Sequence, residues 1–145
     1  MRKVTRSALV PYQAAQMFSL VADIESYPGF LPWCSGARIE RETGDEVQAR
    51  LDVAKGPVRK SFTTRNRHVD QRQIAMSLVD GPFRHLNGMW RFEPIAEDGC
   101  RVELHLEFEF ASRILGRMLD PIFNEIANTM VDAFCRRAAD VYGAA

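Results

Sequence analysis

The chain has 145 residues, enough for one domain with a substantial hydrophobic core. Its 19 Lys and Arg residues balance 19 Asp and Glu residues, so the overall charge does not favour binding to DNA or to an anionic membrane. No apolar run reaches the roughly 18 residues of a membrane-spanning helix. The N-terminus has no apolar signal-peptide core, and the three cysteines are far apart and form no C-x-x-C motif. These features predict a single cytoplasmic domain, residues 1–145, with reduced cysteines.

The N-terminal part predicts a strand, a helix and an unusual connection. Residues 3–10 have a strand pattern that Pro11 ends, and residues 12–21 predict a short amphipathic helix. Residues 23–33 contain two prolines and a glycine, so they allow only a short helix or tight turns. Large apolar side chains on this connection either reach the mouth of a pocket or plug one end of the core. They are Tyr27, Phe30, Leu31 and Trp33.

Six strands are predicted in the middle of the chain. They cover residues 37–42, 47–53, 58–68, 74–78, 85–92 and 102–110. In the last of these, apolar and polar side chains alternate without a break from Arg101 to Phe110. Alternation with one buried and one solvated face is typical of an antiparallel sheet. Turn residues separate the strands, so we expect hairpins and an α+β fold with the helices on one side of the sheet.

The C-terminal residues 112–143 predict a long amphipathic helix. At 100° per residue, its apolar side chains cover an arc of roughly 220°, whereas a helix on a flat sheet needs only about 100°. We therefore expect a curved sheet that wraps around the helix. Ser112 is a suitable N-cap and Gly143 a suitable C-terminal stop. Pro121 follows Asp120 and either begins a second helical piece or kinks one continuous helix.

Motifs for catalysis or metal binding are missing from the sequence. There is no phosphate-binding glycine loop, no nucleophile elbow and no zinc-protease motif. The three histidines are not at metal-ligand spacing, and the acids of residues 102–110 lie on the polar face. The inward faces are expected to be nearly pure hydrocarbon. The sequence therefore predicts no catalytic residue and no metal site, and any pocket should hold an apolar molecule.

The strand at residues 58–68 is strongly basic. Six Lys and Arg residues and one acid lie in the segment from Val53 to Arg72 inclusive. Arg59, Arg65 and Arg67 share its polar face. This face either contacts the phosphates of RNA or is a solvated surface balanced by neighbouring acids. No aromatic residue shares the face, so base stacking is not expected.

Several segments resemble a known family over nearly the whole chain. They are YPGFLPWC at 27–34, FTTRN at 62–66, LVDGPFRHLNGMWRFEP at 78–94 and CRVELHLEFEF at 100–110, before a long terminal helix. These segments resemble the START-like coenzyme Q-binding family of the polyketide cyclase/lipid transport superfamily, and within it the bacterial ribosome association toxins.

The resemblance implies a helix-grip fold. In this fold a seven-stranded antiparallel sheet wraps around a long C-terminal helix and an apolar cavity, with two short helices after the first strand. It also implies two activities. One is binding of a polyisoprenoid quinone such as ubiquinone, without a covalent cofactor, in support of respiration. The other is binding to the large ribosomal subunit, which blocks subunit joining.

The first hypothesis is a non-enzymatic carrier of a quinone or other lipid that makes transient contact with a membrane. Its expected cavity lining is Phe62, Leu78, Trp90, Phe92, Leu104, Leu106, Phe108, Leu119, Phe123, Ile126 and Met130. Its expected mouth consists of Tyr27, Phe30, Trp33 and Phe83. The second hypothesis is binding to ribosomal RNA of the large subunit through Arg59, Arg65 and Arg67. An enzyme is disfavoured because inward titratable groups are not expected.

Overall fold

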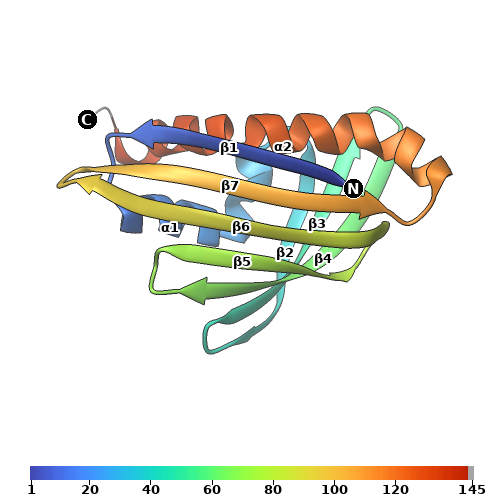
Figure 1. Ribbon diagram of the computed structural model, residues 1–145, viewed down its shortest axis with the longest axis horizontal. Coiled ribbons are helices and arrows are strands. Elements are labelled where there is room, and N and C mark those ends of the chain that lie inside the picture. The colour runs from blue at the N-terminus through green and yellow to red at the C-terminus, as the bar shows by residue number, and fades with distance from the viewer. Residues whose placement is uncertain (144–145) are drawn as a thin grey trace.

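A seven-stranded antiparallel sheet forms the larger part of the computed structural model, which describes residues 1–143 (Figure 1). The strands are β1 (Arg2–Val10), β2 (Cys34–Thr43), β3 (Glu46–Lys55), β4 (Val58–Val69), β5 (Gln73–Asp80), β6 (Phe83–Ala96) and β7 (Gly99–Phe110). Their order in the sheet is β1-β7-β6-β5-β4-β3-β2. Each strand from β2 onward therefore pairs with the next in a hairpin, while β1 pairs with β7. The predicted α+β class and all seven predicted strands are confirmed.

The helices occupy the two places that the sequence predicts. Between β1 and β2 lie α1 (Ala14–Ala22) and the short 3-10 helix η1 (Ile24–Gly29). The C-terminal helix α2 (Arg113–Tyr142) is continuous through Pro121, so the single-helix alternative is correct. The Ser112 hydroxyl accepts a hydrogen bond from the Leu115 N–H at 3.2 Å, and Gly143 ends the helix. No helix within residues 1–143 is both long enough and apolar enough to cross a membrane.

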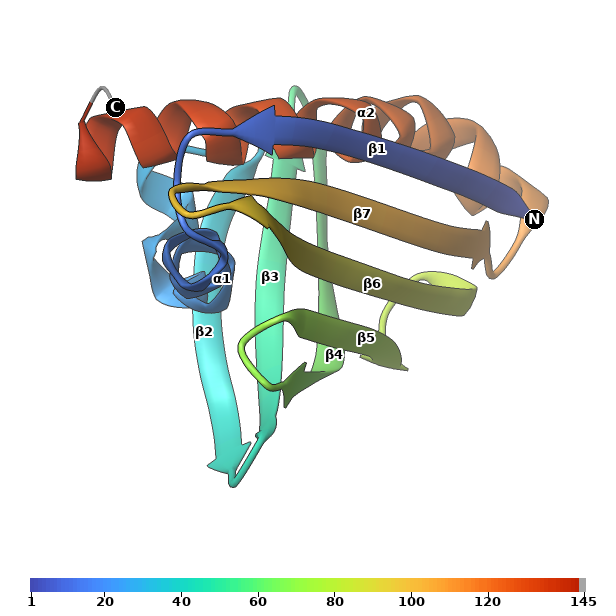
Figure 2. The same cartoon turned by 60° about the vertical axis from the view of Figure 1, so that its left-hand side comes forward.

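The sheet is strongly curved around α2. Figure 2 shows β2 and β3 running nearly across the direction of β6 and β7, with α2 lying along β1 over the enclosed side. Register shifts in the β2–β3, β4–β5 and β6–β7 pairs bend individual strands. This curvature confirms the prediction that the sheet wraps the helix.

The buried side of α2 is narrower than the apolar arc in the sequence. Its buried residues are Leu119, Phe123, Ile126, Ala127, Val131, Ala133, Phe134 and Ala138, which span roughly 160° at 100° per residue. Leu115, Ile122 and Met130 are half-buried, and Met118 is 42% exposed. The buried side is therefore narrower than the apolar arc, because some apolar residues at the edges of the arc remain in contact with solvent.

Ion pairs tie α2 to the sheet at its surface. Asp120 pairs with Arg2 on β1, and Glu125 pairs with Lys55 at the end of β3. Exposed pairs of this kind contribute at most about 1 kcal/mol each. Burial of the apolar side of the helix therefore dominates its attachment, and the ion pairs help to set its position along the strands.

The turn between β5 and β6 generates a prediction about stability. Gly81 has a φ of +154°, and a Cβ there would lie 2.7 Å from the Phe62 Cβ. Gly81→Ala should therefore lower the free energy of unfolding by about 1–3 kcal/mol. Gly29→Ala is the matched control, because its Cβ would meet nothing within 4 Å. Urea denaturation of both variants tests this, and equal stability would mean that the turn relaxes without strain.

Candidate functional site

An internal cavity of about 80 Å³ lies between the inward face of the sheet, α2 and η1. Seventeen residues line it: Ile24, Tyr27, Trp33, Ala49, Leu51, Phe62, Thr64, Asn66, Met76, Leu86, Gly88, Trp90, Leu106, Phe108, Phe123, Ile126 and Met130. The strands supply these side chains at every second position, because alternate residues of a strand face the same side. The walls are apolar except for two polar side chains and the polar atoms of one tyrosine and two tryptophans.

The cavity brings together nine of the fifteen residues predicted to contact a ligand. These are Tyr27, Trp33, Phe62, Trp90, Leu106, Phe108, Phe123, Ile126 and Met130. The other six do not line it: Phe92, Leu104 and Leu119 are completely buried elsewhere in the core, Phe83 is buried, and Phe30 and Leu78 are half-buried. Alternation along the strands predicted the inward face of the strand residues in this set, but it did not identify which of them border the cavity. Their role as ligand contacts stays a prediction.

The aromatic residues of the expected mouth are packed into the core. Tyr27, Trp33 and Phe83 are 6–8% exposed. Phe30 packs against Tyr27 and Phe134 with ring centroids 6.0 and 5.2 Å away. Tyr27, Phe30 and Trp33 therefore agree with the alternative in which the side chains of residues 23–33 close one end of the core. Phe83 packs against Phe62 and Phe123, in a different aromatic cluster.

The inward face of β4 is more polar than the sequence predicts. Thr64 and Asn66 line the cavity and are 7% and 6% exposed. The Thr64 hydroxyl donates a hydrogen bond to the Asn66 side-chain oxygen at 2.8 Å. The expectation of a nearly pure hydrocarbon interior was therefore wrong here. The sequence pattern could have predicted this, since the alternation that places Phe62 and Thr64 on the inward face also places Asn66 there.

The same alternation places His68 inward, near the end of β4. Its ring packs edge-on against Phe18 with centroids 5.1 Å apart, and its Nε2 is buried without a hydrogen-bond partner. Burial lowers the pKa of this imidazole, although Glu42 and Asp45 act in the opposite direction. His68 lies outside the set of cavity-lining residues, so it adds no proton donor to the cavity.

Gly88 on β6 leaves space for two neighbouring side chains that line the cavity. A Cβ at this position would lie 2.5 Å from the Met76 Cε and 2.7 Å from the Leu106 Cδ2. Both of those side chains line the cavity. A glycine here therefore lets them lie over the strand instead of being displaced into the open space.

Titratable groups are scarce at the cavity. Among its lining residues, all within the described part of the chain, there is no carboxyl, thiol or imidazole group. The Tyr27 hydroxyl donates its hydrogen bond to the Val21 carbonyl, and burial raises its pKa. Cys34, beside Trp33, is buried and outside the lining, and burial raises the pKa of its thiol to about 11. The walls therefore suit apolar binding better than proton transfer.

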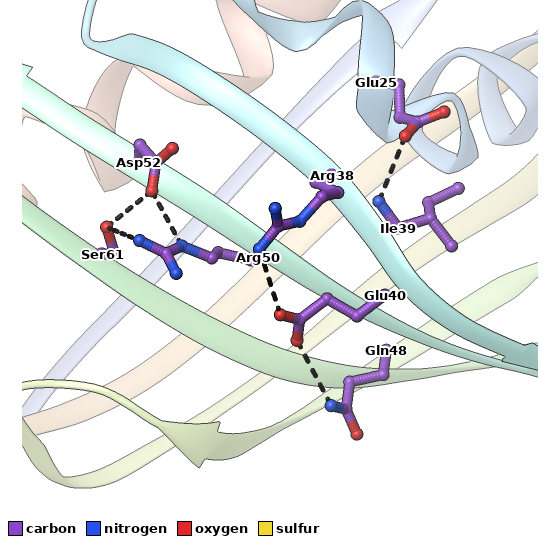
Figure 3. Close-up of polar contacts among 8 residues, drawn as sticks. All are labelled: Glu25, Arg38, Ile39, Glu40, Gln48, Arg50, Asp52 and Ser61. Atoms are coloured by element: carbon purple, nitrogen blue, oxygen red, sulfur yellow. Dashed lines mark hydrogen bonds and ion pairs between the residues drawn. The ribbon is translucent and has the colours of Figure 1, made fainter.

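The outer face of β2, β3 and β4 carries charged side chains that are partly paired (Figure 3). Arg50 donates to Asp52 at 3.1 Å and to Ser61 at 3.1 Å. The Ser61 hydroxyl also donates to Asp52 at 2.6 Å, and this bond together with the Arg50 guanidinium lowers the pKa of the carboxyl group. In the same figure, Glu40 accepts from Gln48 and pairs with Arg38. These contacts neutralise two of the arginines on β2 and β3.

The three arginines predicted on the polar face of β4 are not neutralised in this way. Arg59, Arg65 and Arg67 are exposed, and none makes an ion pair within residues 1–143. Arg65 and Arg67 border an outer hollow of about 640 Å³, which also contains Glu46 and Glu107. The strand therefore presents three arginines that form no ion pair, two of them beside a recess that also contains two glutamates.

The amino-acid sequence is similar to a known protein family and to several named proteins. Residues 10–135 match the family described as polyketide cyclase/dehydrase and lipid transport. The Vibrio cholerae ribosome association toxin RatA is 50% identical over 143 residues, covering 99% of each chain. The mitochondrial coenzyme Q-binding protein COQ10 homolog B of Xenopus laevis is 29% identical, over 96% of this chain and 59% of its own.

A solved structure shows the same fold at lower identity. The Zhui aromatase/cyclase from Streptomyces sp. R1128 superimposes with a TM-score of 0.83 at 20% identity, covering 99% of each chain. At that identity the likeness concerns the fold and not the activity. The family match over residues 10–135 and the full-length relatives lead to one conclusion: the chain belongs to the polyketide cyclase/dehydrase and lipid transport family and has its START-like helix-grip fold.

Proposed function

We propose that the protein binds a hydrophobic small molecule, an isoprenoid quinone or a lipid of similar shape, in the cavity under α2. The observation that carries the proposal is an internal space with apolar walls and only two polar side chains, Thr64 and Asn66. Burial of apolar ligand surface supplies about 25 cal/mol per Å². The coenzyme Q-binding name of the Xenopus laevis relative supports a quinone as the ligand.

Binding requires the cavity to widen. Its volume of about 80 Å³ is well below the roughly 300–1,000 Å³ of ordinary ligand pockets. Met130 on α2 is half-buried and borders the space. Methionine has an unbranched, flexible side chain that adapts to irregular gaps. Movement of Met130 therefore offers room for a quinone ring, while a long isoprenoid tail has to extend out of the domain.

Binding without catalysis fits the chemistry of the walls. Acid–base catalysis needs a titratable group within hydrogen-bonding reach of the reacting atoms. Among the described residues that line the cavity, the tyrosine hydroxyl is the one group of this kind, and it is engaged with a backbone carbonyl. The proposal is therefore a carrier and not a cyclase.

Filling the cavity from the helix tests this proposal. Met130→Trp should weaken binding of decyl-ubiquinone at least about 10-fold, because the larger side chain occupies the space. Equilibrium dialysis measures the affinity, and circular dichroism verifies the fold. Met118→Trp is the matched control, since Met118 lies on the same helix, is 42% exposed and does not line the cavity. Unchanged affinity in a folded Met130→Trp protein would contradict the assignment of the cavity.

We propose binding to the large ribosomal subunit as a second function, through the outer face of β4. Two observations support it. Arg59, Arg65 and Arg67 have no ion-pair partner within residues 1–143, and the 50% identical Vibrio cholerae relative is named a ribosome association toxin. At about 3.3 Å per residue, the three arginines extend over roughly 26 Å of the strand, long enough to meet several phosphates of an RNA backbone.

Charge removal on this strand tests the second function. Replacing Arg59, Arg65 and Arg67 with Ala should abolish co-sedimentation with large ribosomal subunits at low salt, because phosphate contacts release counterions and depend steeply on salt. The control replaces Arg113, Arg117 and Arg136, three exposed arginines of α2, and so makes the same change in net charge. Loss in both triple variants would point to a non-specific effect of charge, and retention in the β4 variant would exclude this face.

A further inference from the structure

The cavity has an unpaired hydrogen-bond donor at one end. Asn66 on β4 is 6% exposed and lines the cavity. Its side-chain oxygen accepts a hydrogen bond from the Thr64 hydroxyl at 2.8 Å. Its side-chain nitrogen has no hydrogen-bond acceptor among residues 1–143. The fully buried side-chain atom that lacks a hydrogen-bond partner in the described chain is the His68 Nε2. The Asn66 nitrogen therefore keeps accessible surface, and since Asn66 lines the cavity, an acceptor placed there could reach it.

In the structure the Asn66 side-chain oxygen, and not its nitrogen, lies against the Thr64 hydroxyl. Because the oxygen is engaged by the hydroxyl of the same strand, the NH₂ group is the part left for a ligand. Trp33 and Trp90 also line the cavity. The Tyr27 hydroxyl is already used by the Val21 carbonyl. The Asn66 NH₂ group at the cavity is therefore available to donate a hydrogen bond to an acceptor atom of a ligand.

We propose that Asn66 is the residue that recognises the head group of the ligand, by donating a hydrogen bond to a carbonyl oxygen. The inference rests on the proposed binding of a hydrophobic molecule in this cavity. It narrows the ligand class to apolar molecules with a ring or chain carbonyl, such as quinones and ketones, and it disfavours plain hydrocarbons. A carbonyl has acceptor lone pairs and no donor, which matches an amide NH₂ that needs an acceptor.

The position of Asn66 also orients the ligand. Phe62 lies four residues earlier on the same face of β4, about 13 Å away along the strand. Phe62 and Phe123 border that other end of the cavity, and their ring centroids are 5.7 Å apart. The carbonyl head therefore lies near Asn66 and the apolar tail runs toward this aromatic pair.

A pair of probes separates head-group recognition from apolar burial. Decyl-ubiquinone carries two ring carbonyls, and decylbenzene has the same alkyl tail and no carbonyl. The protein has two tryptophans, both at the cavity, so quenching of their fluorescence reports decyl-ubiquinone, and decylbenzene is measured by displacement of that probe. We expect the natural protein to bind the quinone about 10-fold more tightly than the hydrocarbon.

Removing the amide should remove this preference. In Asn66→Leu the two affinities should agree to within about 2-fold, through weaker binding of the quinone and not of decylbenzene. Asn87→Leu is the matched control, because Asn87 is exposed on β6 and borders the outer hollow instead of the cavity. It should keep the 10-fold preference.

Two other outcomes would overturn the assignment of Asn66. If Asn66→Leu keeps the preference, the assignment of Asn66 is overturned while the proposed binding function stands. If the natural protein binds neither probe, the binding function fails, and the assignment fails with it. Asn66→Leu leaves the Thr64 hydroxyl without its acceptor. The double variant Thr64→Val/Asn66→Leu removes both polar groups and provides the same comparison if the single variant is unstable.

Discussion

Two phenylalanines on one side of α2 hold the helix inside the curved sheet. Phe123 packs against Phe62 and Phe83, with ring centroids 5.7 and 5.1 Å away. Phe134 packs against Tyr27 and Trp90, at 5.3 and 5.4 Å. The two lie eleven positions apart in the sequence, which places them on nearly the same side of the helix and about 16 Å apart. The cavity lies between these clusters, where Ile126 and Met130 face the sheet.

This arrangement would allow a ligand to enlarge the space between the two clusters while the clusters themselves stay packed. Edge-to-face aromatic contacts favour particular geometries and stabilise each cluster beyond simple burial. Ile126 and Met130 make no such contacts, and Met130 is half-buried. A ligand can therefore displace the middle of the interface while both ends of α2 stay in place. The helix does not have to leave the sheet for the cavity to open.

The sequence predicted the fold better than the site, for a physical reason. Alternation along residues 102–110 identifies a face of β7, and Ser112 and Gly143 mark the ends of α2 by local backbone chemistry. These signals are local, so they can be read from one segment at a time. Whether Leu104 or Leu106 borders the cavity depends on what the opposing elements fill, and only the assembled core decides that. Leu104 is fully buried among other side chains, whereas Leu106 lines the space.

The polar residues of β4 connect the two proposed functions, because they lie on both faces of one strand. Asn66 faces the cavity, and its neighbours Arg65 and Arg67 face solvent on the opposite side of the sheet. Side chains on opposite faces of a strand do not touch, so one site can influence the other only by moving the backbone of β4. That backbone pairs with β3 along one edge and with β5 along the other, which resists such movement. Ligand binding inside and RNA binding outside should therefore be separable by substitution on a single strand, and a protein that has lost one activity should retain the other.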